Sequence, residues 1–319
     1  MNIHGNDMKI FTANANPKVA KEIANILGLP LGESDVGTFS DGEIAVNIYE
    51  SVRGSDVFVV QSTSAPVNDN LMELLIMIDA FKRASAGRIT AVVPYFGYSR
   101  QDRKAKARDP ITAKLVADLI SVAGADRILT MDLHSPQIQG FFAIPVDDMQ
   151  GMSILAPHFK ERFRNQLDNI VCVSPDLGSV ARARNFSQRI GTSLAIIDKR
   201  RQKANESEIM NIIGDVKDKI VIIVDDMIDT AGTLCNAAAA VIERGGAKEV
   251  YAAAIHGVLS GDAVEKIKNS HLKEVVLLDT INIPQEKRIE KMRLLPVANV
   301  FAQAIERIFA DKPISSLFN

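Results

Sequence analysis

Two adjacent carboxylates and a turn of small and hydroxylated residues follow one apolar run in the second half of the chain. The run is residues 220–224, the carboxylates are Asp225 and Asp226, and the turn reads Asp229-Thr230-Ala231-Gly232-Thr233. Such a turn at a helix N-terminus offers backbone N–H groups and hydroxyls that bind phosphate. The carboxylates would repel a bare phosphate, but they can hydrogen-bond sugar hydroxyls or hold Mg²⁺. The segment predicts a site for a phosphorylated sugar, and the alternative is a helix cap without a ligand.

This turn needs a strand before it and a helix after it, and both patterns recur along the chain. Apolar runs typical of strands, as at 56–63 and 89–96, alternate with helical patterns at 70–87, closed by Gly87, and at 112–124. The alternation is typical of βαβ units around a mostly parallel sheet. Ligands of such sheets bind where a strand leads into a helix. The sequence therefore predicts an α/β fold with its site at a strand end.

A weak internal repeat predicts two similar domains. Residues 52–63 align with residues 216–227, about 164 positions later, and each segment precedes a loop, an apolar helix and another strand. A chain of 319 residues is also long enough for two domains. We expect an N-terminal α/β domain at 1–150 and a C-terminal one at 151–319, with the last residues packing back on the first domain. The boundary is expected near 145–155.

Composition excludes several other classes of protein. The net charge of −2 gives no overall basic field for a nucleic acid. The two cysteines, Cys172 and Cys235, are far apart in the sequence and provide neither a disulfide framework nor a zinc motif. No apolar run reaches the length of about 18 residues that a membrane helix needs. We expect a cytoplasmic protein with no nucleic acid or membrane partner.

Further segments contain clustered polar or charged residues. They are Phe39-Ser40-Asp41-Gly42-Glu43, residues 95–104 with Arg100 and Gln101, residues 131–135 with His134, residues 174–179 with Asp176, and residues 197–201 with Lys199 and Arg201. Taken singly, they could be a polar turn, a basic loop or RNA-binding segment, a structural histidine and a solvated hairpin. In this order, and together with the turn at 225–233, they resemble class I ribose-phosphate pyrophosphokinase over nearly the whole chain.

The resemblance implies a fold and roles for individual residues. The fold would be two similar phosphoribosyltransferase-like domains, each a mostly parallel sheet flanked by helices. ATP would contact Phe39, Asp41, Gly42, Glu43, Arg100 and Gln101. Ribose 5-phosphate would contact Arg201, Asp225, Asp226, Asp229, Thr230, Ala231, Gly232 and Thr233. Lys199 and Arg201 would be catalytic, and His134 and Asp176 would bind Mg²⁺. An allosteric site would include Arg53, Lys82, Arg83, Ser315, Ser316 and Phe318.

The reaction implied is transfer of the β,γ-diphosphate of MgATP to the carbon-1 hydroxyl of ribose 5-phosphate, which gives 5-phosphoribosyl 1-pyrophosphate and AMP. The resemblance also implies Mg²⁺ as cofactor, activation by inorganic phosphate, inhibition by ADP, and a homohexamer built from dimers. Cations on a mobile loop suit a transition state rich in phosphate charge. The residues themselves do not reveal a general base for the sugar hydroxyl.

One position departs from the family pattern. Ser179 stands where the family usually has a glycine in the loop that receives pyrophosphate. This departure leaves open a non-catalytic regulatory homologue, which keeps the fold and loses site residues. The turn at 225–233 alone would also suit a phosphoribosyltransferase or a simple sugar-phosphate-binding module, but neither explains the segments at 39–43 and 95–104.

Overall fold

The computed structural model describes residues 7–200 and 209–317, except for the side chains of residues 199, 200, 209 and 210. The chain forms two compact units. Unit 1 consists of the chain up to Gln150 together with 280–282 and the segment from Pro296 onward, and unit 2 consists of 151–279 and 283–295. The segments 280–282 and 296–319, which the predicted division gave to the second domain, therefore lie in unit 1.

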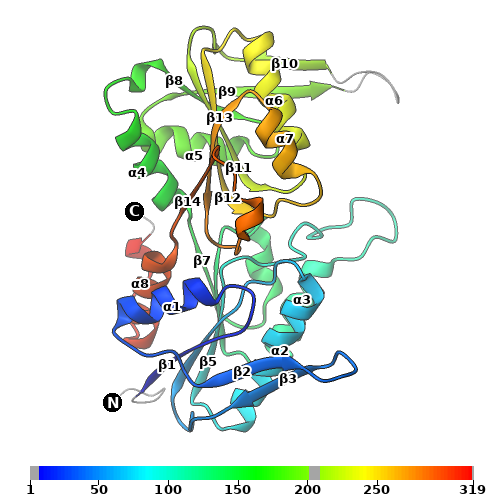
Figure 1. Cartoon of the computed structure of the whole chain (residues 1–319), viewed down its shortest axis with the longest axis vertical. Helices are drawn as coiled ribbons and strands as arrows, with labels where there is room; N and C mark the ends of the chain where they lie inside the picture. The colour runs from blue at the N-terminus through cyan, green and yellow to red at the C-terminus, as the bar shows by residue number, and fades with distance from the viewer. Residues whose placement is uncertain (1–6, 201–208, 318–319) are drawn as a thin grey trace. The chain divides into compact units, whose positions relative to one another are not determined.

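Unit 1 is built on a five-stranded parallel sheet with the order β1-β4-β5-β6-β7. These strands are β1 (Met8–Thr12), β4 (Asp56–Val60), β5 (Arg88–Val93), β6 (Arg127–Met131) and β7 (Val146–Met149). The helices are α1 (Pro17–Leu27), α2 (Val67–Arg83), α3 (Thr112–Ala123) and α8 (Ala298–Phe309), with 3-10 turns η1 (Pro136–Phe141) and η4 (Ser315–Leu317). Helices α1 and α8 cover one face of the sheet, and α2 and α3 cover the other (Figure 1). A separate hairpin pairs β2 (Ser34–Thr38) with β3 (Ile44–Ile48).

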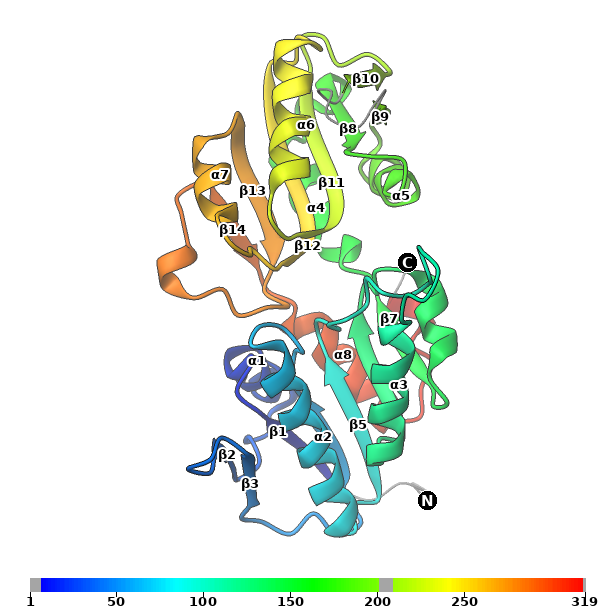
Figure 2. The same cartoon turned by 90° about the vertical axis from the view of Figure 1, so that its right-hand side faces the viewer.

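Unit 2 is built on a seven-stranded sheet with the order β10-β9-β8-β11-β12-β13-β14, in which only the β9–β10 pair is antiparallel. The strands are β8 (Ile170–Ser174), β9 (Ser193–Arg200), β10 (Ile209–Ile213), β11 (Ile220–Ile228), β12 (Glu249–Gly257), β13 (Leu272–Leu278) and β14 (Met292–Leu295). The helices are α4 (Met152–Arg162), α5 (Val180–Ile190), α6 (Gly232–Glu243) and α7 (Ala263–Asn269), with 3-10 turns η2 (Leu167–Asn169) and η3 (Gln285–Lys287). Helices α6 and α7 lie on one face of the sheet, and α4 and α5 lie on the other (Figure 1 and Figure 2).

The two units repeat the same order of elements. The series β1-α1-β2-β3-β4-α2-β5-α3-β6-β7-α4 corresponds step by step to β8-α5-β9-β10-β11-α6-β12-α7-β13-β14-α8. The order of the parallel strands also corresponds, with β4 in the place of β11. This is the alignment of 52–63 with 216–227 that the sequence predicts. The predicted fold class, with parallel sheets flanked by helices, is confirmed.

The last helix of each repeat belongs to the other unit. Helix α4 follows β7 of the first repeat but lies in unit 2, where it packs on α5. Helix α8 follows β14 of the second repeat but lies in unit 1, where it packs on α1. Its apolar face, which includes Phe301 and Ile305, is completely buried. The two repeats have thus exchanged their terminal helices.

Local chemistry explains where the site-bearing elements begin and end. Pro17 suits the first turn of α1, and Gly28 ends that helix in the left-handed region. Strands β4 and β8 are buried at every position, as expected for parallel strands covered on both faces. In the described part of the chain, no helix has both the length and the apolar character needed to cross a membrane.

Two predicted boundaries were wrong. Helix α2 ends at Arg83 and not at Gly87, because Ser85 adopts a φ of 63° and the chain turns there. Strand β11 does not stop before the carboxylates but continues to Ile228, since Asp225 pairs with Ala254 and Ile228 with Gly257 of β12. The backbone of Asp225 is therefore fixed by the sheet.

Candidate active site

The β11–α6 turn of unit 2 has the features of a phosphate site. Helix α6 begins at Gly232 after Ala231, which takes the left-handed conformation with φ 59° and ψ 0°. The N-cap residue Ala231 has no polar side chain that could cap the first N–H groups of this helix. Thr230 and Thr233 are exposed on either side of this helix start. An anion bound here would meet backbone donors, hydroxyls and the positive end of the helix dipole.

The backbone of this turn is held by the neighbouring loop. The N–H of Ser260 donates to the carbonyl of Asp229 over 3.0 Å, and the N–H of Leu259 donates to the carbonyl of Ile228 over 3.0 Å. These bonds use only carbonyl groups of the turn. They therefore do not occupy the N–H groups at the start of α6. These two bonds attach the turn to the segment that follows β12.

The two carboxylates before the turn differ in exposure. The Asp225 side chain is 23% exposed, whereas that of Asp226 is 7% exposed. Nη1 of Arg182 lies 3.7 Å from Oδ1 of Asp225 and 3.5 Å from Oδ1 of Asp226, and its charge partly compensates the pair. Burial, followed by the charge of Asp226, raises the pKa of Asp225 to about 7. Asp225 is the more accessible of the two carboxyls to a ligand.

The β8–α5 loop carries Asp176 beside this pair. The hydroxyl of Ser174 donates to the carbonyl of Asp176 over 2.7 Å, and the N–H of Ser179 donates to Oδ1 of Asp176 over 3.0 Å. A Cβ at Gly178 would lie 3.3 Å from that Oδ1, so the loop turns tightly around the carboxyl. The hydroxyl of Ser179 donates to Oδ1 of Asp225 over 2.8 Å. The structure therefore brings the loop at 174–179 and the carboxylates of β11 together.

Lys199 lies near the end of β9, opposite Met210 of β10 in the antiparallel hairpin. Arg201 lies outside the described residues. Of the two predicted catalytic cations, only Lys199 can therefore be placed, near the end of strand β9.

The segment Phe39–Glu43 forms the tip of the β2–β3 hairpin in unit 1. The N–H of Phe39 donates to the carbonyl of Glu43 over 2.7 Å, and the N–H of Glu43 donates to Oδ1 of Asp41 over 3.1 Å. Gly42 takes a φ of 94°, which favours glycine. The Phe39 ring is 60% exposed. A tight hairpin that presents an aromatic ring to the outside is suited to stacking on a base or on another protein surface.

Arg100 and Gln101 precede helix α3 in unit 1. Both residues are exposed. The side-chain oxygen of Gln101 accepts a hydrogen bond from the Thr112 hydroxyl, and its carbonyl accepts one from the N–H of Ala113 over 3.2 Å. Gln101 therefore fixes the start of α3, which sequence reasoning did not indicate.

His134 follows β6 in unit 1, whereas its predicted partner Asp176 belongs to unit 2. The loop of His134 is fixed by the N–H of Leu133, which donates to Oδ1 of Asp148 over 3.2 Å. Within residues 7–200 and 209–317, no group of three or more His, Cys, Asp or Glu side chains is arranged to hold a metal ion. A carboxylate such as Asp176 is a ligand that Mg²⁺ accepts, with water and phosphate oxygens completing its coordination.

Comparison with known proteins decides the family. Residues 8–124 match a family described as the N-terminal domain of ribose phosphate pyrophosphokinase, and residues 200–319 match the phosphoribosyl synthetase-associated domain. Ribose-phosphate pyrophosphokinase of Clostridium perfringens is 63% identical over 318 residues, which cover 100% of this chain and 99% of that protein. The chain belongs to the ribose-phosphate pyrophosphokinase family.

Other members of this family agree in length and fold. The ribose-phosphate pyrophosphokinase of Caldanaerobacter subterraneus is 64% identical over 313 residues, covering 98% of each chain. The crystal structure of phosphoribosylpyrophosphate synthetase from Mycobacterium smegmatis superimposes with a TM-score of 0.91 at 42% identity, covering 96% of this chain and 100% of that one. The two-unit fold is therefore the fold of the pyrophosphokinase family.

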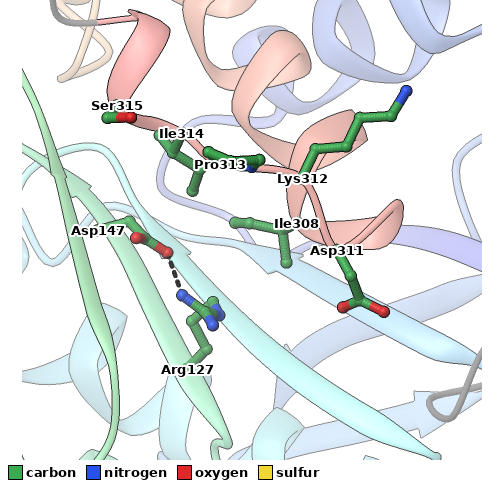
Figure 3. Close-up of a pocket in the computed structure, with 8 residues that line it drawn as sticks. All are labelled: Arg127, Asp147, Ile308, Asp311, Lys312, Pro313, Ile314 and Ser315. Atoms are coloured by element: carbon green, nitrogen blue, oxygen red, sulfur yellow. Dashed lines mark hydrogen bonds and ion pairs between the residues drawn. The ribbon is translucent and has the colours of Figure 1, made fainter.

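The predicted allosteric residues fall into two groups in this pyrophosphokinase. Arg53 lies next to the segment that follows α2, the helix that ends with Lys82 and Arg83. The N–H of Gly54 donates to the carbonyl of Ser85 over 2.8 Å. Ser315 instead lines a pocket of about 530 Å³ (Figure 3). Its other lining residues are Arg127, Asp147, Ile308, Asp311, Lys312, Pro313 and Ile314. Ser316 follows in the turn η4, and Phe318 lies outside the described residues.

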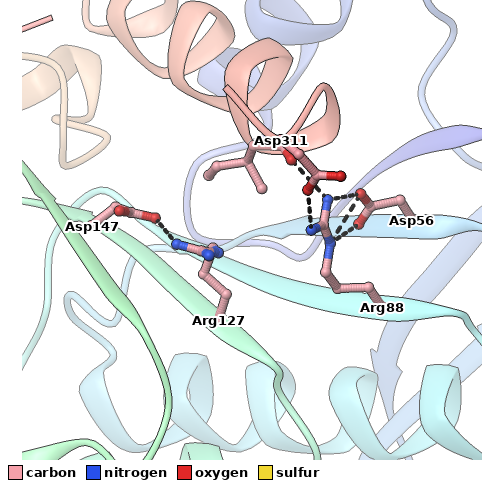
Figure 4. Close-up of polar contacts among 6 residues, drawn as sticks. Asp56, Arg88, Arg127, Asp147 and Asp311 are labelled. Atoms are coloured by element: carbon pink, nitrogen blue, oxygen red, sulfur yellow. Dashed lines mark hydrogen bonds and ion pairs between the residues drawn. The ribbon is translucent and has the colours of Figure 1, made fainter. Parts of the chain in front are cut away.

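A buried arginine holds the segment that leads to this pocket. The guanidinium of Arg88 forms a bidentate ion pair with Asp56 and donates to the carbonyl of Ile308 over 2.9 Å (Figure 4). It also lies 3.5 Å from Asp311. Since Ile308 is near the C-terminal end of α8, the cation also compensates the negative end of that helix. Arg88 thus ties the C-terminal segment to strands β4 and β5.

Three of these structural residues were missed by sequence reasoning. Arg88 and Asp56 begin neighbouring strands, a position at which charged residues are ordinarily solvated. Arg182 had a usable signal, because a cation in the first turn of α5 is unfavourable for the helix dipole. Such a cation indicates nearby anions, which are Asp225 and Asp226.

Proposed function

We propose that the protein transfers the β,γ-diphosphate of MgATP to the carbon-1 hydroxyl of ribose 5-phosphate and releases AMP. The observation that carries this proposal is the β11–α6 turn, where the partly accessible carboxylate of Asp225 precedes a helix N-terminus whose N-cap residue, Ala231, has no capping side chain. This arrangement suits one ligand with both hydroxyls and a phosphate. The end-to-end similarity to ribose-phosphate pyrophosphokinases supports the choice of reaction.

In this proposal the β11–α6 turn positions the sugar. The start of α6, with Thr230 and Thr233, binds the 5-phosphate, and Asp225 accepts hydrogen bonds from ring hydroxyls. Because the sheet fixes the backbone of Asp225, the carbon-1 hydroxyl is held in one orientation. Displacement at phosphorus depends on such in-line positioning and on neutralising charge over the equatorial oxygens.

The ATP end of the reaction is assigned to residues of both hairpins and of the segment before α3. Phe39 stacks on the adenine, and Asp41, Gly42 and Glu43 contact it at the hairpin tip. Arg100 and Gln101 contact ATP from the segment before α3. Lys199 and Arg201 provide positive charge for the phosphoryl oxygens of the transition state.

His134 and Asp176 would hold Mg²⁺. The ion supplies neutralisation of phosphate charge when bound. The residues fit such a role because the Asp176 carboxyl is already oriented by the N–H of Ser179 and is only half-buried. Asp225 and Asp226 add negative charge close to that loop, which favours a cation there.

We also propose that the protein self-associates as a homohexamer built from dimers, acts in the cytoplasm, is activated by inorganic phosphate and is inhibited by ADP. A row of apolar side chains along α3 supports self-association. It consists of Ile111, Leu115, Leu119 and Val122, which are 36%, 57%, 39% and 77% exposed. Their spacing places them on one side of the helix, as expected of a helix face that packs on a partner.

The test is AMP formation from ATP with Mg²⁺ and phosphate, in the presence and absence of ribose 5-phosphate. We expect AMP only with the sugar, in equal amount to 5-phosphoribosyl 1-pyrophosphate. A folded protein that binds ATP and forms no AMP would indicate the regulatory homologue. Consumption of added 5-phosphoribosyl 1-pyrophosphate with a nucleobase would indicate a phosphoribosyltransferase.

A further inference from the structure

Ser179 occupies the N-cap of α5 without using its hydroxyl as a cap. A serine at this position ordinarily accepts a hydrogen bond from an N–H in the first turn of the helix. Here no side-chain cap is formed, and the hydroxyl donates instead to Oδ1 of Asp225 over 2.8 Å. The residue is 6% exposed, so this contact is largely shielded from solvent. The Ser179 hydroxyl therefore bonds to a residue 46 positions away instead of capping its own helix.

Ser179 also connects its own loop to strand β11 through its two polar groups. Its N–H donates to Oδ1 of Asp176, and its hydroxyl donates to Oδ1 of Asp225. One residue therefore joins the β8–α5 loop to strand β11. A glycine at this position would keep the first bond and lose the second.

Three contacts of Asp225 involve Oδ1, and the carboxyl of Asp226 is a further hydrogen-bond partner of its side chain. Oδ1 accepts the Ser179 hydroxyl and the N–H of Asp226 over 2.9 Å, and Nη1 of Arg182 lies 3.7 Å from the same atom. These contacts fix the rotation of the carboxyl about its Cβ–Cγ bond. In this orientation the carboxyl, whose side chain is 23% exposed, can accept a hydrogen bond from a hydroxyl of a ligand.

We propose that Ser179 is a positioning residue for the sugar site, which acts by orienting the carboxyl of Asp225 toward the hydroxyls of ribose 5-phosphate. This inference rests on the proposed function, since it takes ribose 5-phosphate as the ligand of the β11–α6 turn. It accounts for a serine at a position where the family pattern predicts a glycine, because the hydroxyl forms a hydrogen bond with Asp225 of strand β11.

The first experiment measures ribose 5-phosphate binding by calorimetry and the KM of each substrate for Ser179→Gly and Ser179→Ala. Glycine is well tolerated at an N-cap, so Ser179→Gly is expected to fold. Loss of a hydrogen bond to a charged group predicts a Kd and a KM for ribose 5-phosphate raised about tenfold. The KM for ATP should stay within about twofold, because the bond lost is on the sugar side.

The matched control is Ser187→Ala. Ser187 is a buried serine of the same helix, and its hydroxyl donates to the carbonyl of Arg184 over 2.9 Å. This variant removes the same atoms from α5 without touching Asp225. Its affinity for ribose 5-phosphate should equal that of the unaltered protein. An equal loss in both serine variants would mean that any damage to α5 weakens binding, and would overturn the inference.

A double-mutant cycle separates orientation of Asp225 from other effects. If Ser179 acts through Asp225, then Ser179→Ala should cause no further loss of ribose 5-phosphate affinity when Asp225 is already alanine. An undiminished loss in that background would overturn the inference. If the unaltered protein itself binds no ribose 5-phosphate, the proposed function fails. If it binds and Ser179→Gly binds equally well, only the role of Ser179 fails.

Discussion

The loops after β4 and β11 occupy the same place in the two repeats but use their polar residues in opposite ways. After β4, residues 61–64 are 0–5% exposed and bond to their own unit. Gln61 donates to Glu73 over 2.8 Å and accepts from the N–H of Ala15 over 2.9 Å, and the Ser62 hydroxyl donates to the carbonyl of Thr280 over 2.6 Å. Near the end of β11, Asp225 is partly accessible, and Thr230 and Thr233 around the start of α6 are exposed.

The comparison teaches that the repeat supplies a scaffold and that the strand-end residues decide its use. In unit 1 the polar groups of the loop after β4 form internal hydrogen bonds, which stabilise the fold. In unit 2 the same position leaves carboxylate, hydroxyl and backbone groups for a ligand. Function resides in the site and not in the shared topology. Substitutions in the two loops should therefore affect different properties of the protein.

The largest expected effect concerns the two hairpins, which also correspond between the repeats. Lys199→Ala should lower turnover about 10²–10³-fold while the fold stays intact, because it removes a cation from the transition state. Phe39→Ala, in the corresponding hairpin of unit 1, should instead raise the KM for ATP about tenfold. Steady-state kinetics and circular dichroism check both. Turnover of Lys199→Ala within tenfold of the parent would contradict the catalytic assignment.

Asp225→Asn should weaken ribose 5-phosphate binding by about 10–100-fold, through loss of charged hydrogen bonds. The same change should stabilise the unliganded protein at pH 8. Burial raises the pKa of Asp225 to about 7, so its protonated carboxyl stabilises the folded protein. This contribution is complete below the ordinary pKa near 3.8 and is lost as the pH rises through 7.

Melting temperatures at pH 5.5 and pH 8 test this trade between stability and binding. Between pH 5.5 and pH 8 the melting temperature of the unaltered protein should fall by about 2–6 °C more than that of Asp225→Asn, by the usual relation between stability and melting temperature. Equal pH dependence of the two proteins would show that the carboxyl titrates in its ordinary range.

Gln61→Ala tests the loop after β4 in unit 1, whose polar groups are expected to serve stability and not binding. It should destabilise the protein by about 2–3 kcal/mol, because the carboxylate of Glu73 and the N–H of Ala15 lose a buried partner. Chemical denaturation measures this loss. Ribose 5-phosphate affinity of the remaining folded protein should be unchanged, and a selective loss of affinity would mean that the unit 1 loop also serves the sugar site.

The smallest effect is expected at Ala231, whose φ of 59° is unfavourable for a residue with a side chain. Ala231→Gly should stabilise by about 0.5 kcal/mol, since relief of about 1–2 kcal/mol exceeds the loss of one buried methyl, about 0.8 kcal/mol. Ala239→Gly, inside α6, should destabilise by about 1 kcal/mol. Denaturation curves of the two variants should shift in opposite directions.

The sequence was sufficient for features that are encoded locally. The apolar run at 220–224 predicted β11, and the turn at 229–233 predicted a helix N-terminus that the structure has. The end of α2 could not be predicted, because Ser85 took the left-handed position that glycine usually fills. The contact of Ser179 with Asp225 spans 46 positions and depends on how β8 and β11 pair, which no local pattern encodes. Membership of α8 in unit 1 depends likewise on packing against α1.

The exchanged terminal helices have a consequence for how the chain folds during synthesis. The strands of unit 1 can form their sheet early, but helix α1 packs on α8, which is synthesised only after all the strands of unit 2. Unit 1 must therefore wait for the whole of unit 2 to be made before its core is closed. A fragment that ends near residue 295 would keep both sheets and still leave α1 without the helix that packs on it, and we expect it to aggregate.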